Sequence, residues 1–339
     1  MTKLLRQKLR FQFPTNNNTF QSRINAIAYH HSYIYVTGFL NTDDDDFTNP
    51  GTFELGNGVT VTTQNGRQQV FVAKFNHQLV AQNARVITTN GARNSVGNAI
   101  AVNNHGVYIT GNLRHDPNGD QSGGTIDFGN SVRVTTQAEQ AQIFVAKFNH
   151  QLVAQNARLI TTSESSQGEG IAVNNHGVYI TGCLRHDPNG DQSGGTIDFG
   201  NHVRVTTQTE HAHVFVAKFN HHLVSQNARV ITTDDTSIGF GIAVNNHGVY
   251  IKGYIDNNGG VINFGNGHHA RNFDIEDDMF IVKYNHHLET QAVDIIQNSG
   301  AETGTGIALS NNSVYVCGHD NNDTDGKLFK YSLCKHITQ

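Results

Sequence analysis

Hydrophobic and polar residues alternate along this chain in short runs that Gly, Asn and Asp residues separate. In the run 144–149, Phe144, Ala146 and Phe148 are spaced two apart, so they fall on one side of an extended chain. A period of two predicts β-strands, and no stretch shows the period of 3.6 that an amphipathic helix requires. The clearest stretch predicts four strands, at residues 170–174, 178–182, 214–220 and 228–233.

This strand pattern occurs five times. The second strand of each copy reads Tyr-Val-Thr-Gly or a close variant, and it ends at Gly38, Gly111, Gly182, Gly253 and Gly318, which are 73, 71, 71 and 65 residues apart. A hairpin is expected between the second and third strands, at 124–129 with 132–136, and again at 195–207, 260–265 and 52–56; the last copy omits it. The repeats span about residues 20–90, 91–162, 163–233, 234–297 and 298–332.

Four antiparallel strands per repeat, with apolar residues on both faces, predict an all-β, five-bladed β-propeller that occupies residues 1–339 as a single domain. A parallel β-solenoid is the alternative, although its coils use shorter repeats. The last repeat stops after its third strand, and residues 9–13 resemble the fourth strand at 84–88. We therefore expect the N-terminal strand to complete the last blade and close the ring, because closure removes exposed sheet edges.

Composition narrows the expected partners and location. The net charge is −5 and only 15% of residues are charged, so the chain lacks the basic character of a nucleic-acid-binding protein. The three cysteines are too few for a disulfide framework and are expected to be free thiols. Residues 1–8 lack the apolar core of a signal peptide, and no run is long enough to span a bilayer. These features predict a soluble protein of the cytoplasm or a virion, with no membrane insertion.

Several motifs resemble a known repeat. The stretches 143–147 (IFVAK), 170–173 (GIAV), 177–182 (GVYITG) and 196–200 (TIDFG) are similar to the units of the SBBP-type β-propeller repeat family. The resemblance covers nearly the whole chain and implies a propeller scaffold or surface-recognition role, with no catalytic set to carry over. The turns hold Asn and His where that family favours Asp and Gly. This composition is similar to that of proteins of large DNA viruses of amoebae, which suggests a virion component.

Antiparallel strands divide the loops between two faces. Turns such as 103–106 and 149–152 hardly vary between repeats, whereas the connections at 90–97, 163–169, 234–238 and 298–305 differ. A ligand without five-fold symmetry needs unlike residues around it, so we expect binding on the variable face; unconstrained drift is the alternative. The hypothesis is a non-enzymatic module that recognises a protein or glycan, with candidate binding residues Arg93, Asn94, Glu164, Glu169, Asp234 and Asp235.

Two loops place oxygen-bearing side chains at alternating positions, as calcium loops of the EF-hand kind do. Against a calcium site, the sixth position is Gln, the twelfth is Asp instead of Glu, and no helices flank the loops. Asp-Pro-Asn-Gly is also a strong turn sequence, so a solvated turn remains the alternative. The candidate calcium ligands are Asp116, Asn118, Asp120, Ser122 and Asp127 in one loop, and Asp187, Asn189, Asp191, Ser193 and Asp198 in the other.

The chain has 20 histidines, and many of them occupy two repeated turns. Two such turns of one sheet are separated by two strand spacings, roughly 10 Å, which is too far for shared metal coordination. His211 and His213 would share a strand face and could chelate. We interpret most of the histidines as turn residues that tolerate positive φ.

An enzyme is the alternative function. No Ser-His-Asp order, phosphate-binding glycine loop or nucleophile elbow is present, so no catalytic residue is assigned. A glycosidase would use two carboxylates at the mouth of the propeller channel. Self-association through the histidine-rich face is a further possibility within the binding class. The candidates for the carboxylate pair of a glycosidase are acids that occur in single repeats: Asp43 to Asp46, Glu164, Glu169, Asp234, Asp235, Asp274, Glu276, Asp277 and Asp278.

Overall fold

The computed structural model describes residues 22–41, 50–64, 68–89, 95–114, 124–136, 140–256, 260–271, 278–296, 306–310, 313–319 and 326–332. Over these ranges the protein is all-β, as predicted, and contains no helix. Accordingly, no helix that could cross a membrane occurs in the described part of the chain. The chain divides into two compact units, Met1–Glu139 with Phe144–Leu159 (unit 1) and Gln140–Ile143 with Ile160–Gln339 (unit 2).

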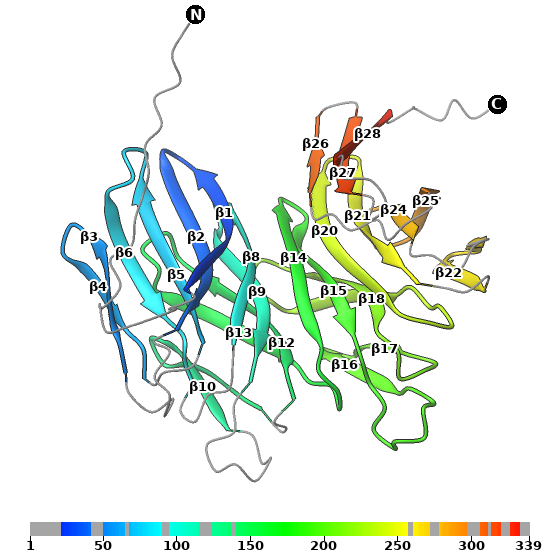
Figure 1. Ribbon diagram of the computed structural model, residues 1–339, viewed down its shortest axis with the longest axis horizontal. Helices are drawn as coiled ribbons and strands as arrows, with labels where there is room; N and C mark the ends of the chain where they lie inside the picture. Colours follow the sequence, from blue (N-terminus) through cyan, green and yellow to red (C-terminus); the bar gives the residue numbers. More distant parts are fainter. Residues whose placement is uncertain are drawn as a thin grey trace, which may run out of the picture. The chain divides into compact units, whose positions relative to one another are not determined.

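Unit 1 holds two four-stranded antiparallel sheets (Figure 1). Sheet 1 has the order β1-β2-β5-β6, and sheet 2 has the order β8-β9-β12-β13. The bounds of sheet 1 are Arg23–His30 (β1), Tyr33–Leu40 (β2), Gln69–Asn76 (β5) and Ala81–Val86 (β6). Those of sheet 2 are Val96–Asn103 (β8), Gly106–Leu113 (β9), Gln142–Phe148 (β12) and Ala154–Ile160 (β13). Hairpins β3–β4 and β10–β11 are inserted, at Thr52–Gly56, Val59–Thr62, Thr125–Gly129 and Val132–Thr135, and the short β7 (Thr88–Thr89) pairs with β10.

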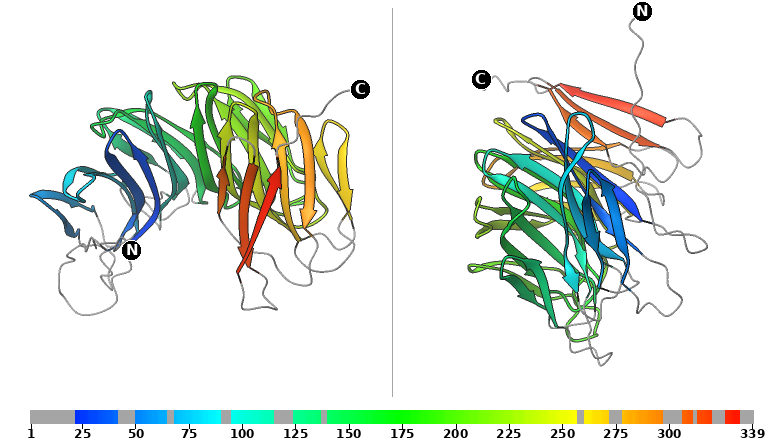
Figure 2. Two further views of the ribbon diagram at one scale, coloured as in Figure 1. Left: turned by 90° about the horizontal axis from the view of Figure 1, so that it is seen from above. Right: turned by 90° about the vertical axis from the view of Figure 1, so that its left-hand side faces the viewer.

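Unit 2 holds two further four-stranded sheets and one of three strands, as Figure 2 shows from two sides. Sheet 3 consists of β14 (Gln167–Asn174), β15 (Gly177–Leu184), β18 (His213–Phe219) and β19 (Ser225–Val230). Sheet 4 consists of β20 (Ser237–Asn245), β21 (Gly248–Ile255), β24 (Asp278–Tyr284) and β25 (Thr290–Ile296). Sheet 5 consists of β26 (Ile307–Leu309), β27 (Ser313–His319) and β28 (Gly326–Ser332). The inserted hairpins are β16–β17 (Thr196–Gly200, Val203–Thr206) and β22–β23 (Val261–Gly265, His268–Arg271).

The predicted strands and hairpins are confirmed, with differences of a few residues at their ends. In the third repeat the first strand begins at Gln167 instead of Gly170, because it continues through a bulge. The predicted N-terminal strand, residues 9–13, lies outside the described residues, as does the connection 298–305.

A β-bulge in the first strand of each four-stranded sheet explains the repeated glycine. The register shifts between Gly168 and Gly170 in sheet 3, and at the matching place in sheets 1, 2 and 4. The bulge brings the carbonyl of Gln167 against Gly182, where a Cβ would overlap it. In these four sheets the bulge therefore requires the Gly of the Tyr-x-x-Gly motif, since any side chain there would collide with the neighbouring strand.

The core of each unit lies between neighbouring sheets. In unit 1 the cluster joins Tyr35, Val70 and Val72 of sheet 1 to Val107 and Phe144 of sheet 2. In unit 2 the equivalent residues of sheet 3 pack against sheet 4 in the same way, with Tyr179, Val214, Val216, Val249 and Phe280. The Thr of the first three motifs is also buried, and Thr37, Thr110 and Thr181 donate hydrogen bonds of 2.7, 2.6 and 2.7 Å to carbonyls of the third strand. Burial of these apolar side chains is the main stabilising contribution.

Candidate functional site

Each four-stranded sheet has two edges with different chemistry. The turns between its first and second strands and between its third and fourth strands lie together, and we call this the turn edge. The inserted hairpins and the connections between sheets lie at the opposite ends of the strands, which we call the loop edge (Figure 1). The predicted binding residues were expected at the loop edge.

Four of the six predicted binding residues are described, and all of them lie at the loop edge of unit 2. Glu164 and Asp234 are exposed, whereas Glu169 and Asp235 are half-buried. No hydrogen bond or ion pair of the described residues joins these four carboxylates into one group. Arg93 and Asn94 lie outside the described residues.

Glu169 differs from the other three because it is the bulge residue of β14. Its counterparts at the bulges of the other four-stranded sheets are Asn25, Asn98 and Phe240. Burial raises the pKa of the Glu169 carboxyl. Burial also raises the pKa of the neighbouring Cys183 thiol to about 11, and the Glu169 charge adds to that effect. One backbone position therefore presents an amide, an acid or an aromatic ring, depending on the sheet.

A second group of acids and histidines lies where sheet 3 connects to sheet 4. His211 Nδ1 lies 4.0 Å from Asp235 Oδ1, and both side chains are partly exposed. Burial raises the pKa of Asp256; the nearby Asp235 carboxylate raises it further, and His211 opposes the shift. The Asp235 carboxylate is thus close enough to influence the ionisation of Asp256. Sequence reasoning selected Asp235 but missed Asp256, because its position after β21 gave no sign of this neighbour.

His213 is fully buried at the start of β18, so it is not available at the surface together with His211. Its Nε2 lies 3.0 Å from Thr209 Oγ1, while its Nδ1 is buried without a hydrogen-bond partner in the described part of the chain. Burial lowers the pKa of His213 to about 4. Over the described ranges, no three His, Cys, Asp or Glu side chains are grouped so that they could hold a metal ion.

His213 occupies a position that carries Gln142 in sheet 2. The Gln142 side chain accepts a hydrogen bond of 2.6 Å from the Thr162 amide and donates one of 3.1 Å to the Thr162 carbonyl. This pair of bonds anchors the connection to the next sheet. A Thr hydroxyl also bonds a loop carbonyl in both connections, from Thr162 to Glu164 (2.7 Å) and from Thr233 to Asp235, so the two connections differ in the Gln142 bonds. The loop edge therefore varies in how its connections are held as well as in the side chains it exposes.

The described copy of the predicted calcium loop is held by its own backbone. Asp187 accepts hydrogen bonds from the amides of Gly190 (3.0 Å) and Gln192 (2.7 Å). Asp191 accepts from the amide and the hydroxyl of Ser193. Asp198 accepts from the Gly200 amide (2.6 Å) and from Arg204 Nε (3.0 Å). These bonds form an Asx-type turn and a surface ion pair, and the calcium assignment stays a prediction.

In the other copy only Asp127 is described. Asp127 accepts hydrogen bonds from the Gly129 amide (2.7 Å) and from Arg133 Nε (2.8 Å), as Asp198 does from Gly200 and Arg204. Asp116, Asn118, Asp120 and Ser122 lie outside the described residues.

The turn edge of unit 2 contains a cluster that the sequence analysis did not expect. The ring of His286, from sheet 4, stacks on His176 of sheet 3 with centroids 4.0 Å apart. His286 Nδ1 also lies 3.2 Å from the hydroxyl of Tyr179, and Lys218 Nζ lies 5.8 Å from the Tyr179 ring centroid. Burial lowers the pKa of His286, and His176 and Lys218 lower it further.

Unit 1 has a matching cluster at its turn edge. His150 of sheet 2 stacks on His30 of sheet 1 at 5.4 Å, and His30 lies 4.0 Å from His31. Lys74 Nζ lies 3.7 Å from the centroid of the Tyr33 ring. These contacts join adjacent sheets, so the spacing between turns of one sheet did not predict them. The signal available in the sequence was the recurrence of His in both turns of each repeat.

No model of a protein family matches the chain, and no curated protein is significantly similar to it. The assignment of function therefore depends on the sheets and their two edges.

Proposed function

We propose that the five sheets are blades of one closed β-propeller, and that this propeller is a non-enzymatic scaffold that binds a protein or glycan through its loop edge. The likeness to SBBP-type repeats supports the scaffold part of the proposal. The virion hypothesis and the absence of a nucleic-acid partner belong to the same proposal, because both rest on composition.

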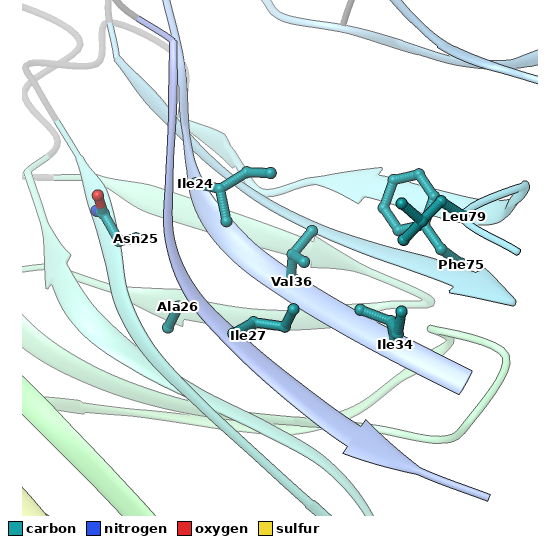
Figure 3. Close-up of a pocket in the computed structure, with 8 residues that line it drawn as sticks. All are labelled: Ile24, Asn25, Ala26, Ile27, Ile34, Val36, Phe75 and Leu79. Carbon is teal, nitrogen blue, oxygen red and sulfur yellow. The ribbon is translucent and has the colours of Figure 1, made fainter. Parts of the chain in front are cut away.

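The outer face of sheet 1 has a groove of about 310 Å³ that is lined mainly by apolar side chains of β1, β2 and β5 (Figure 3). Ile27 beside this groove is 68% exposed, whereas its equivalents Ile100, Ile171 and Ile242 are 7%, 7% and 8% exposed. Ile100 and Ile242 lie in sheets that pack against a preceding sheet of the same unit. An apolar face of this kind is costly to leave in water.

The repeat indicates what would cover the groove. The side chains of sheets 2 and 4 equivalent to Ile34 and Val36 are buried by the Tyr-bearing face of the preceding sheet. Sheet 5 uses Val314 and Val316 to pack against the Tyr250 face of sheet 4. By the same rule its opposite face, which carries Tyr315, is the partner that sheet 1 lacks. This equivalence supports closure by sheet 5.

Substitution of Ile27 tests closure. In a closed ring Ile27→Asp places a charge in an apolar interface, and we expect a loss of stability of about 3 kcal/mol in urea unfolding. The matched control is Ile100→Asp, which alters a residue already buried between sheets 1 and 2. If Ile27→Asp costs less than about 0.5 kcal/mol while the control is severe, sheet 1 is open to solvent and closure is wrong. Light scattering distinguishes closure from coverage by a second copy.

The binding part of the proposal depends on one observation: the same backbone presents different side chains at each loop edge. The bulge carries Asn25, Asn98, Glu169 or Phe240, and the anchor position carries Gln142 or His213. A rigid framework with unlike residues at one edge is typical of proteins that bind an asymmetric partner.

A glycan array and a panel of candidate partner proteins test this proposal. We expect Glu169→Gln and Asp235→Asn to weaken binding of any partner found by about tenfold, because each removes a charge from the edge. The matched control at the turn edge is His247→Gln, which should leave affinity unchanged. If His247→Gln abolishes binding and the loop-edge variants retain it, the loop edge is not the recognition surface.

Asp235 and Asp256 are the specific observation that favours the alternative of a glycosidase, because burial and the nearby Asp235 carboxylate raise the pKa of Asp256, as the acid of a catalytic carboxylate pair requires. Hydrolysis of a panel of aryl glycosides by the wild type, by Asp256→Asn and by Asp235→Asn tests it. Activity that both variants abolish would replace the non-enzymatic proposal. Activity absent from the wild type as well would leave the pair as part of a binding edge.

A further inference from the structure

The fourth strand of sheet 1 holds a turn of sheet 2 through two of its side chains. Asn83 Nδ2 donates a hydrogen bond of 2.6 Å to the Gln151 carbonyl, and Arg85 Nε donates one of 2.8 Å to the Leu152 carbonyl. Both donors belong to β6, and both acceptors belong to the turn between the third and fourth strands of sheet 2. We call this pair of hydrogen bonds the staple.

Unit 2 repeats the staple between sheets 3 and 4. There Asn227 Nδ2 donates to the His287 carbonyl (2.5 Å), and Arg229 Nε donates to the Leu288 carbonyl (2.6 Å). Like Leu152 in sheet 2, Leu288 has a φ of 59° and a fully buried side chain. Because the same two bonds form in both units, the staple is a regular part of the contact between one sheet and the next.

Sheet 1 has the same turn but no staple in the described part of the chain. Leu79 has a φ of 60°, and its amide donates a hydrogen bond of 3.0 Å to the Asn76 carbonyl, as in the turns of sheets 2 and 4. No described side chain donates to the Gln78 or Leu79 carbonyl. The Leu79 side chain is half-buried instead of fully buried, and it lies beside Phe75 at the groove of sheet 1 (Figure 3). Over the described ranges this turn therefore lacks the partner that a preceding sheet supplies elsewhere.

The sequence before β1 carries the donors that a staple needs. The fourth strands of sheets 1, 2 and 3 share the sequence Gln-Asn-Ala-Arg, at residues 82–85, 155–158 and 226–229. Residues 7–10 read Gln-Lys-Leu-Arg, and the alternating residues 11–13 follow them as in a strand. Lys donates hydrogen bonds as the Asn side chain does, so both donor positions are kept. The fourth strand of sheet 4 has Ala292 and Asp294 at these positions, so it does not carry the pattern.

We propose that the N-terminal segment supplies the staple of sheet 1: residues 7–10 dock on the turn between its third and fourth strands, and Arg10 Nε donates a hydrogen bond to the Leu79 carbonyl. Lys8 supplies the second bond, to the Gln78 carbonyl. The inference rests on the closed propeller proposed above, and it names the contact that fastens the N-terminal segment to sheet 1.

The segment can reach this turn, and Arg suits the acceptor. An extended chain spans about 3.3 Å per residue, so the connection from Arg10 to Arg23 at the start of β1 can span roughly 40 Å. Four strands side by side are only roughly 15 Å across. A guanidinium keeps its charge at any working pH, and its hydrogen bond to a carbonyl is stronger than one between neutral groups.

Cross-linking within the full chain tests the position of the segment. Lys8→Cys and Gln78→Cys are combined in one chain and treated with a short bis-maleimide. We expect the two introduced thiols to be joined within one molecule, as peptide mapping and denaturing gels would show. Every variant also carries Cys317→Ser and Cys334→Ser, so that these native thiols do not compete.

Two further pairs calibrate the cross-linking yield. The positive control is Asn83→Cys with Gln151→Cys, which places the thiols at the same two positions of the staple between sheets 1 and 2. The negative control is Lys3→Cys with Gln78→Cys, which displaces one thiol by about 16 Å along an extended segment and should give much less product.

Thermal unfolding tests the hydrogen bond itself. Arg10→Leu removes the guanidinium and should lower Tm by about 3 °C, because it leaves the Leu79 carbonyl without its charged donor. Arg85→Leu is the reference, since it removes the described bond to the Leu152 carbonyl and should lower Tm by a similar amount. Arg6→Leu changes the same segment outside the staple and should shift Tm by less than about 1 °C.

The proposal is overturned if the pair at positions 83 and 151 is joined and the pair at positions 8 and 78 is not. It is also overturned if Arg10→Leu lowers Tm no more than Arg6→Leu does. A product that joins two molecules would overturn it as well, because the occupant of the turn would then be the segment of a second copy.

These outcomes are separate from the test of closure. If Ile27→Asp is severe while the pair at positions 8 and 78 does not react, the ring is closed and only the staple is wrong. If Ile27→Asp is mild while that pair reacts within one molecule, the staple is correct and closure by sheet 5 is wrong.

Discussion

Sheets 2 and 3 have nearly the same sequence, and the places where they differ are concentrated at the loop edge. Their second strands, β9 and β15, differ at one position, Asn112 against Cys183. Their third strands differ at the first two positions, where Gln142 is replaced by His213 and Ile143 by Val214. All of these positions lie next to the loop edge, whereas the turns at the other edge repeat Asn-Asn-His-Gly.

Sheets 2 and 3 share the features that hold their strands together, which we call the framework, and differ at the loop edge. The framework is set by the bulge, the Gly that permits it and the buried Thr, and these are the same in both sheets. The anchor of the outgoing connection differs, since an amide bonds the backbone in sheet 2 and an imidazole replaces it in sheet 3. A single side chain can therefore change how a connection responds to pH while the strands keep their register.

The largest effect is expected from the framework. A Cβ at Gly182 would overlap the Gln167 carbonyl, so Gly182→Ala should lower stability by about 4 kcal/mol or more in urea unfolding, and Gly111→Ala should do the same in sheet 2. The control is Gly190→Ala. It has a φ of +68° but open space around it, and it should cost only about 1 kcal/mol. Equal costs at Gly182 and Gly190 would show that the bulge can yield, and that the framework is not fixed.

The next largest effect is expected from acid, which should destabilise the protein through the His213 anchor of sheet 3 but not through the Gln142 anchor of sheet 2. The folded-state pKa of His213 is about 4 against an ordinary 6.5, so the unfolded chain binds its proton first as the pH falls. Stability from this group is complete above pH 6.5 and is lost as the pH falls toward 4, on the order of 3 kcal/mol in total. His213→Gln should remove this part of the acid sensitivity and restore an amide anchor like that of Gln142. The exposed His202→Gln is the control.

Measurements of unfolding at pH 7.5 and pH 4.5 decide whether His213 causes this acid sensitivity. If His213→Gln and His202→Gln lose the same stability between these two pH values, the buried imidazole does not carry the acid sensitivity of sheet 3.

The third effect is smaller and concerns the amide anchor itself. Gln142→Ala removes two hydrogen bonds to the Thr162 backbone and leaves its amide and carbonyl without partners in a buried place, which should cost about 1 to 3 kcal/mol. Gln142→His should cost a similar amount at pH 7.5 and should add acid sensitivity to sheet 2. An unchanged pH profile in Gln142→His would mean that the surroundings of His213, and not the residue type, set its behaviour.

The sequence supported the fold much better than the sites. Apolar and polar residues alternate in β12 and β18, and turn residues flank these strands. Both signals are local, so they locate the strands. The contact between His176 and His286 was missed because it joins adjacent sheets, and no local pattern measures that distance. Asp256 was missed for the same reason, while Glu169 was selected as a variable acid without any sign that a bulge buries it.

The smallest expected effect concerns calcium. Both oxygens of Asp187 already accept amide hydrogen bonds, and Asp198 is bonded to Gly200 and Arg204. A calcium ion would have to displace these bonds, so we expect 5 mM calcium to change Tm by less than about 1 °C in the wild type. A true site at 100 times its Kd would stabilise the protein by about 2.7 kcal/mol, which is readily measured. Asp187→Asn is the discriminating variant: a calcium-dependent rise in Tm that this substitution abolishes would establish the site, and the loop edge of sheet 3 would then gain a metal-dependent anchor in place of a backbone turn.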